Sequence, residues 1–167
     1  MRVLCGRLQL RQKIHISYDV TSYKICIVQY VLDTSVVAAG LRSRHGASNA
    51  LLRMAHQAKF KLLASPPLFL EYEDVLLRPE QRLAHGLSVE QVNEFLTELA
   101  ALIEPVDIHF LWRPQVSDPG DEMVLEAAIN GRADALVTYN VRHFAPAGLR
   151  FQLSVLTPQQ ALVEIDL

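Results

Sequence analysis

The sequence contains few of the residues that define several large protein classes. It has two cysteines in 167 residues, Cys5 and Cys26, so neither a disulfide framework nor a zinc knuckle is expected. The histidines show no His-x-x-x-His spacing, which argues against a zinc site. A Gly-rich phosphate loop and a Gly-x-Ser-x-Gly nucleophile elbow are also missing from the sequence. The chain therefore lacks the signatures of several common enzyme classes.

Long hydrophobic runs are also missing. Half of the residues are hydrophobic and 20% are charged, which is typical of a soluble globular protein. The longest apolar run, residues 25–32, is interrupted by Gln29 and is far shorter than the roughly 20 residues that a membrane span needs. Residues 1–10 are too short and broken for a good signal peptide. We therefore expect a cytoplasmic protein without a membrane segment.

The charge is unevenly distributed along the chain. Residues 1–25 carry five basic side chains and one acidic one, whereas residues 26–167 carry 11 basic and 17 acidic ones. An acidic domain attracts nucleic acid poorly as a whole, so a nucleic-acid substrate would need a local basic rim or metal ions. Residues 1–24 show no clear periodicity, and we interpret them as an N-terminal extension, partly ordered or non-native. One domain is expected over residues 25–167.

Beyond the extension, strand-sized apolar runs alternate with helical patterns. Helix starts are marked by Pro66 and Pro67 after Ser65 and by a capping box from Ser88 to Gln91. The expected strands are 25–33, 60–64, 106–110, 135–139 and 151–156. The expected helices are 34–58 with a candidate break at 43–48, 65–77, 88–103, 118–130 with Gly131 as its C-cap, and one from 157 onward. This alternation favours a doubly wound α/β fold with a parallel sheet.

Acidic side chains collect where this fold binds ligands, at the carboxyl ends of the strands. Asp33 ends the first strand, and Glu71 lies on the helix after the second. Further candidates flank the fourth strand: Asp118, Asp121, Glu122, Thr138 and Asn140. Oxygen ligands of this kind suit hard cations such as Mg²⁺ and Mn²⁺, so the sequence predicts a metal site at this edge.

Each acid also has a structural interpretation. Asp33 could simply cap the following helix. Glu71 and Glu73 flank the apolar arc of their helix on opposite sides, so periodicity does not choose between them. Asp118 begins an Asp-Pro-Gly-Asp segment that looks like a helix N-cap followed by proline.

Four motifs in order resemble one known family. They are VLDTSVVAAGL, SPPLFLEYEDVLLRP, SDPGDEMVLEAAINGRADALVTYNVRHF and a final strand leading into LTPQQAL. The order and spacing resemble the PIN-domain family, and within it the VapC-like toxins of bacterial toxin–antitoxin pairs, over roughly residues 28–163. The resemblance implies a three-layer α/β/α sandwich around a mostly parallel sheet of about five strands. It also implies metal-dependent cleavage of RNA.

The resemblance also assigns roles to individual residues. It matches Asp33 to the first metal-binding acid, Glu71 rather than Glu73 to the helix acid, and Asp121 to the third. Asp118 and Glu122 remain close competitors for that third place. The acid that many relatives carry after the fourth strand is here Asn140, whose amide oxygen can ligate Mg²⁺ without adding charge. Secondary candidates are the hydroxyls of Thr34 and Thr138.

The resulting hypothesis is an endoribonuclease toxin that uses Mg²⁺ or Mn²⁺ held by Asp33, Glu71 and Asp121. Candidate RNA contacts on the rim are Arg42, Arg44, Arg142 and His143. The family resemblance also implies a cognate antitoxin that plugs the cleft, and a homodimer.

Two alternatives remain open at this point. One is a catalytically weak or inactive PIN-like module that binds RNA or a protein, for which Asn140 is the best support. The other is a phosphotransfer domain with Asp33 as nucleophile. Dehalogenase-like enzymes would need an acid at position 35, where this chain has Ser35.

Overall fold

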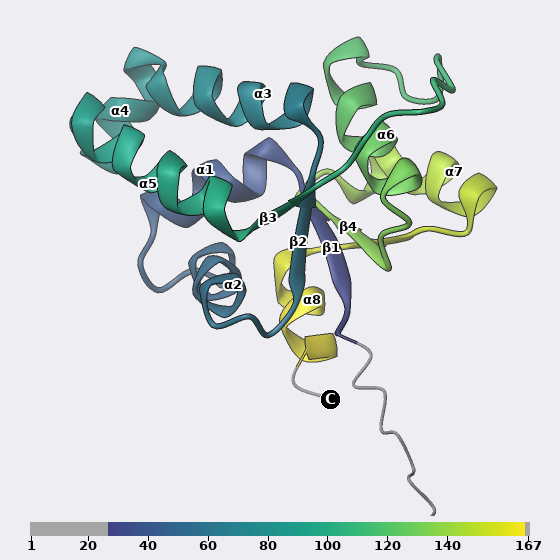
Figure 1. Ribbon diagram of the computed structural model, residues 1–167, viewed down its shortest axis with the longest axis horizontal. Helices are drawn as coiled ribbons and strands as arrows, with labels where there is room; N and C mark the ends of the chain where they lie inside the picture. Colours follow the sequence, from purple (N-terminus) through teal and green to yellow (C-terminus); the bar gives the residue numbers. More distant parts are fainter. Residues whose placement is uncertain (1–26, 166–167) are drawn as a thin grey trace, which may run out of the picture.

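A computed structural model describes residues 27–165 (Figure 1). The N-terminal extension, 1–24, and the expected start of the first strand lie outside the described residues. Residues 27–165 form five parallel strands in the order β3-β2-β1-β4-β5. Their bounds are β1 (Gln29–Leu32), β2 (Lys61–Ala64), β3 (Ile103–Pro105), β4 (Ala135–Val137) and β5 (Ser154–Leu156).

Helices cover both faces of this sheet, which gives the expected three-layer α/β/α architecture (Figure 1). The helices are α1 (Thr34–Arg42), α2 (Ala47–His56), α3 (Pro66–Leu77), α4 (Pro79–His85), α5 (Val89–Leu102), α6 (Glu122–Asn130), α7 (Val141–Phe151) and α8 (Pro158–Ile165). A 3₁₀ turn, η1 (Pro119–Asp121), precedes α6. In one group of helices, α1 packs against α2 and α3, and α2 packs against α8. In the other group, α6 packs on β1, β2 and β4 and contacts α7.

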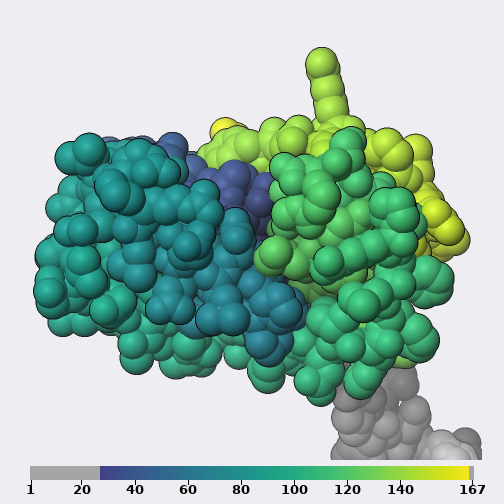
Figure 2. Space-filling model, turned by 90° about the horizontal axis from the view of Figure 1, so that it is seen from above, coloured from purple at the N-terminus to yellow at the C-terminus, as the bar shows by residue number. Residues whose placement is uncertain are grey.

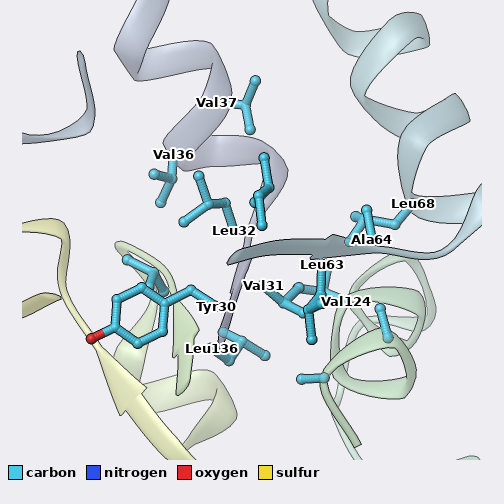
Figure 3. Close-up of a cluster of buried hydrophobic side chains, with 14 of the residues drawn as sticks. Tyr30, Val31, Leu32, Val36, Val37, Leu63, Ala64, Leu68, Val124 and Leu136 are labelled. Carbon is cyan, nitrogen blue, oxygen red and sulfur yellow. The ribbon is translucent and has the colours of Figure 1, made fainter. Parts of the chain in front are cut away.

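The core forms around β1, the central strand. Tyr30, Val31 and Leu32 are fully buried, because a central parallel strand has helices on both faces. Alternate side chains point to opposite faces. In Figure 3 the Tyr30 ring points away from the side where Val31 and Val124 of α6 gather, and its hydroxyl reaches Glu164 of α8 at 3.2 Å. The apolar character of residues 30–32 is therefore explained by burial on two sides.

Several expected boundaries are confirmed. The candidate break at 43–48 separates α1 from α2. The capping box of Ser88 and Gln91 is formed at the start of α5. Gly131 is the C-cap of α6, where an added Cβ would lie 2.8 Å from the carbonyl oxygen of Ala127.

The third strand was predicted wrongly at 106–110. The structure places β3 at Ile103–Pro105, directly after α5, and pairs Leu62 with Ile103. The helix therefore ends before Ile103 rather than including it. Pro105 is tolerated because β3 is an edge strand that needs no second ladder. The apolar residues Phe110 and Leu111 lie instead in an exposed loop.

Two helices were not predicted. The segment of α7 contains Pro146 and Gly148, which disfavour helix interiors. Gly148 is nevertheless required, since an added Cβ would lie 2.8 Å from Val155 Cγ2. Phe151, expected to begin the last strand, is the final residue of α7. The helix α4 was missed because Pro79 ends α3 and also opens the next helix at its first position.

No helix within residues 27–165 has the length and apolar character needed to cross a membrane.

Candidate functional site

A pocket of about 520 Å³ opens at the carboxyl ends of β1 and β4. Viewed from above, the purple residues that end β1 and start α1 lie at the bottom of a depression between the blue-teal and green halves (Figure 2). The residues that line the pocket are Asp33, Thr34, Ser35, Glu71, Val75, Asp121, Tyr139 and Asn140. The pocket thus brings together four of the predicted metal ligands from four separate segments.

Asp33 is fixed at the pocket by the fold itself. Its backbone N–H donates to the Val137 carbonyl at 2.9 Å, which extends the pairing of β1 with β4 by one residue. Its carboxylate caps α1 by accepting from the Ser35 N–H at 3.3 Å and from the Ser35 hydroxyl at 2.8 Å. The side chain is 7% exposed. Asp33 is therefore both a helix cap and a pocket acid.

Thr138, directly after β4, connects Asp33 to the next segment of the chain. The Thr138 hydroxyl donates to Asp33 Oδ2 and accepts from the Asn140 N–H at 2.9 Å. Thr138 is fully buried and does not line the pocket itself. Its position supports a structural role, that of orienting the Asp33 carboxylate.

Glu71, and not Glu73, faces this pocket. Its neighbour Tyr72 is fully buried, and the Tyr72 hydroxyl donates to the Leu32 carbonyl at the end of β1. This hydrogen bond fixes α3 beside the strand that delivers Asp33. Burial and the nearby Asp33 carboxylate raise the pKa of Tyr72, so the hydroxyl remains a donor at neutral pH.

The structure gives different surroundings to Asp118, Asp121 and Glu122, the three candidates for the third metal-binding acid. Asp121 lines the pocket. Asp118 is exposed and caps η1, accepting from the Gly120 N–H at 2.9 Å. Glu122 is 2% exposed, and its Oε1 accepts from the Gln115 and Val116 N–H groups at 2.6 and 3.1 Å. Asp118 and Glu122 therefore hold the local backbone.

Asp121 lies in a negative environment. Burial and the Asp33 carboxylate raise its pKa, with smaller increases from Asp118 and Glu71 and an opposing decrease from His143. His143 Nε2 lies 3.0 Å from Asp121 Oδ2, in a contact that lacks hydrogen-bond geometry and forms an ion pair when the imidazole is protonated. The pKa of Asp121 is therefore raised first by burial and second by the neighbouring carboxylates.

The predicted RNA contacts differ in their positions. His143 is mostly buried beside Asp121, so it is not an open rim residue, and it does not line the pocket itself. Arg42, Arg44 and Arg142 are exposed, and none of the three is among the pocket-lining residues found within 27–165. The Arg42 guanidinium donates to Gln81 Oε1.

Three pocket residues did not emerge from the sequence: Ser35, Val75 and Tyr139. Tyr139 lies between the two candidates Thr138 and Asn140, so its position at a strand end was the available indication. Thr34 was predicted, and its buried hydroxyl has no hydrogen-bond partner among the described residues.

The pocket's chemistry fits a hydrated divalent cation. Its polar side chains offer carboxylate, amide and hydroxyl oxygens, the ligands that Mg²⁺ and Mn²⁺ prefer. The Thr34 hydroxyl is a buried polar group without a hydrogen-bond partner among the described residues. Within residues 27–165, however, no three His, Cys, Asp or Glu side chains converge closely enough to enclose one ion.

Comparison with known proteins identifies the family. Residues 29–142 match the family model of the PIN domain. The fold resembles a chain of VapBC2 from Rickettsia felis, solved bound to a promoter DNA fragment, with a TM-score of 0.52 and 16% identity over 78% of this chain and 98% of that one. A chain of FitAB bound to the IR36 DNA fragment has a TM-score of 0.50 and 16% identity, over 77% of this chain and 94% of that one.

No curated protein matches the sequence. At 16% identity the two solved structures show the fold alone. The family model is independent of them and spans more than half of the sequence. The resemblance in the four sequence motifs is thus confirmed at the level of the family, and the chain belongs to the PIN-domain family.

Proposed function

We propose that this PIN-domain protein is a divalent-metal-dependent endoribonuclease that hydrolyses RNA phosphodiesters in the Asp33 pocket. The observation that carries the proposal is that Asp33, Glu71, Asp121 and Asn140 come from four separate segments and line one pocket at the carboxyl edge of the sheet. Ligands bind at this edge in open parallel sheets.

In this proposal Asp33, Glu71 and Asp121 hold Mg²⁺ or Mn²⁺ directly or through water, with Asn140 as a neutral fourth ligand. Such a cation lowers the pKa of its water and stabilises charge on phosphodiester oxygens. Asp33 supplies the best-oriented carboxylate, because Ser35 and Thr138 fix its rotamer. His143 orients Asp121. Arg42, Arg44 and Arg142 lie farther out, where they can contact only RNA that extends beyond the pocket.

We also propose that the protein acts in the cytoplasm as the toxin of a toxin–antitoxin pair, as a homodimer with a cognate antitoxin. The four sequence motifs and the fold shared with chains of the VapBC2 and FitAB complexes support this proposal. An antitoxin would fit the acidic pocket best by inserting a basic side chain.

The decisive test is RNA cleavage by Asp33→Asn protein. Asparagine caps a helix about as well as aspartate, so α1 should remain folded while a charged metal ligand is lost. We expect cleavage with Mg²⁺ or Mn²⁺ to fall by about a hundredfold or more, equivalent to roughly 3 kcal/mol, and EDTA to abolish it in the parent protein. Gel-based single-turnover cleavage of a labelled RNA measures both effects.

The matched control is Asp107→Asn, which removes an exposed carboxylate that does not line the pocket. It should cleave like the parent. Equal cleavage by the parent and Asp33→Asn proteins would refute the assignment.

Asn140 favours one second candidate, a catalytically weak or inactive module that binds RNA or a protein. Calorimetric titration with Mn²⁺ separates the two candidates. Binding at millimolar or tighter concentrations that Asp33→Asn weakens supports the nuclease. A parent protein that binds RNA but no metal supports the inactive binding module.

A further inference from the structure

Tyr139 is an aromatic residue in an unusual place. It lies between Thr138 and Asn140, immediately beyond the end of β4, and lines the same pocket as Asp33, Glu71 and Asp121. Its side chain is 50% exposed. A large apolar ring at the opening of a carboxylate pocket contributes neither charge nor metal-binding oxygen, so the metal chemistry leaves its presence unexplained.

The ring is held in one orientation. Its hydroxyl lies 2.8 Å from the hydroxyl of Ser48, which is 1% exposed and sits in the first turn of α2. This hydrogen bond joins residues 91 positions apart. Since its hydroxyl is occupied by Ser48, the part of Tyr139 that remains available to a ligand is the ring.

The backbone on both sides of Tyr139 is fixed as well. The Thr138 hydroxyl receives the Asn140 N–H at 2.9 Å and donates to Asp33. The Thr138 N–H donates to the Leu156 carbonyl at 2.9 Å. The position of the ring is therefore coupled directly to the position of the Asp33 carboxylate, and little side-chain entropy remains to be lost when a ligand packs on it.

The hydrogen bond with Ser48 accounts for the Tyr139 hydroxyl, because a serine in the first turn has no carbonyl of its own helix to bond. It does not account for the half of the ring that is exposed at the pocket. Ser48 alone therefore does not explain Tyr139. A flat ring that is half exposed and fixed beside a phosphodiester-cleaving site is suited to stack against an unpaired nucleobase, as aromatic side chains do in proteins that bind single-stranded RNA.

We propose that Tyr139 is a substrate-binding residue that stacks on the nucleobase adjacent to the scissile phosphate of single-stranded RNA. This inference rests on the proposed function of the pocket as a ribonuclease site. Stacking holds the base at a fixed distance from Asp33 and thus places the phosphate over the carboxylates. Because every base has an aromatic face, this contact selects single strands over duplexes rather than one sequence over another.

The test compares Tyr139→Ala with Tyr139→Phe. Both lose the hydrogen bond to Ser48, but only the alanine variant loses the ring. We expect Tyr139→Ala to raise KM about tenfold with little change in kcat, because stacking binds substrate and transition state alike. Tyr139→Phe should stay within about threefold of the parent. Phe110→Ala, which removes a 64% exposed ring outside the pocket, should leave both constants unchanged.

A second measurement identifies the base as the partner of the ring. Two RNA substrates each carry one abasic nucleotide, on the 5′ or the 3′ side of the cleaved phosphate. One of them should raise the KM of the parent by about the same tenfold. On that substrate, Tyr139→Ala should not raise KM further, because the base that the ring contacts is already absent.

The outcomes separate this inference from the proposed function. If the parent cleaves RNA and Tyr139→Ala has the same KM, the stacking role is wrong and the nuclease stands. If Tyr139→Ala raises KM by the same factor on the intact RNA and on both abasic RNAs, the residue is structural. The same conclusion follows if Tyr139→Phe raises KM as much as Tyr139→Ala does. If the parent neither cleaves nor binds RNA, the proposed function and this inference fail together.

Discussion

The two sides of the pocket are held by different kinds of contact. On one side, Asp33 follows β1 and Thr138 follows β4, and these neighbouring strands pair Leu32 with Val137. Main-chain pairing in the sheet fixes this corner. On the other side, Asp121 lies in the short η1 turn, after a loop of residues 106–118 that contains no strand or helix. Main-chain pairing in a sheet therefore cannot fix Asp121.

Side chains of α6 hold the loop in place of a sheet. Glu122, Glu126 and Asn130 recur every four residues, on one face of the helix. Glu122 accepts hydrogen bonds from two backbone N–H groups of the loop. Glu126 accepts two hydrogen bonds from the Arg113 guanidinium, from Nε and Nη2, each at 2.8 Å. Asn130 accepts from the N–H groups of His109 and Phe110 at 3.0 Å.

The difference between the two sides concerns rigidity. The Asp33 corner changes position only if the central sheet changes, whereas Asp121 depends on polar contacts that can adjust without unfolding the core. Burial, the Asp33 carboxylate and, more weakly, Glu71 also raise the pKa of Asp121. Asp121 is thus the acid whose position and charge should respond most to a bound cation.

The largest effect should distinguish Asp121 from Asp118 on the loop side. We expect Asp121→Asn to lower the rate of RNA cleavage by about a hundredfold, because it removes the charge of a proposed metal ligand. Asp118→Asn should change the rate by less than about threefold, because asparagine also caps a helical turn. Single-turnover cleavage of the two variants at saturating Mn²⁺ measures the contrast. A larger loss in Asp118→Asn would show that the loop rearranges when metal binds.

A smaller effect should come from Thr138→Val at the sheet corner. The substitution nearly preserves shape but leaves Asp33 and the Asn140 N–H without their buried partner. We expect the free energy of unfolding to fall by about 1–3 kcal/mol and cleavage to slow by roughly tenfold as Asp33 loses its orientation. Urea denaturation and cleavage assays report the two quantities.

Ser35→Ala is the matched control at this corner. It removes the other side-chain hydrogen bond to Asp33, but Ser35 is exposed, so water can replace the lost hydroxyl. Its effect on stability should be clearly smaller than that of Thr138→Val. If Ser35→Ala and Thr138→Val lowered the free energy of unfolding equally, burial would not explain the importance of the Thr138 hydroxyl.

The smallest effect concerns the pH dependence of stability. Because the pKa of Asp121 is raised in the folded protein, ionising this group costs folding free energy above the folded pKa. The cost disappears as the pH falls below the unfolded value. In EDTA, Asp121→Asn should therefore be more stable than the parent near neutral pH, and the difference should vanish in acid. Thermal unfolding of both proteins across this range gives the comparison, and a difference that grows in acid would contradict it.

The sequence predicts the sheet side of the site better than the loop side. Asp33 could be placed because an apolar run buried on both faces must end at the ligand-binding edge of a parallel sheet. Four of the five strands were placed, whereas β3 was not, because the strand-like alternation of Val106, Ile108 and Phe110 lies in a loop. Helix α7 was missed since local propensity disfavours Pro146 and Gly148, and tertiary packing overrides it.

The sequence by itself determined the α/β class, the alternation of most strands and helices, and the group of acids at one sheet edge, because periodicity and capping are local properties. Only the tertiary structure decided which of Asp118, Asp121 and Glu122 lines the pocket and which of them hold the backbone. All three lie within five residues of each other, so their roles depend on what surrounds them. The position of Tyr139 is explained in the same way, since its anchor Ser48 is 91 residues away in the chain.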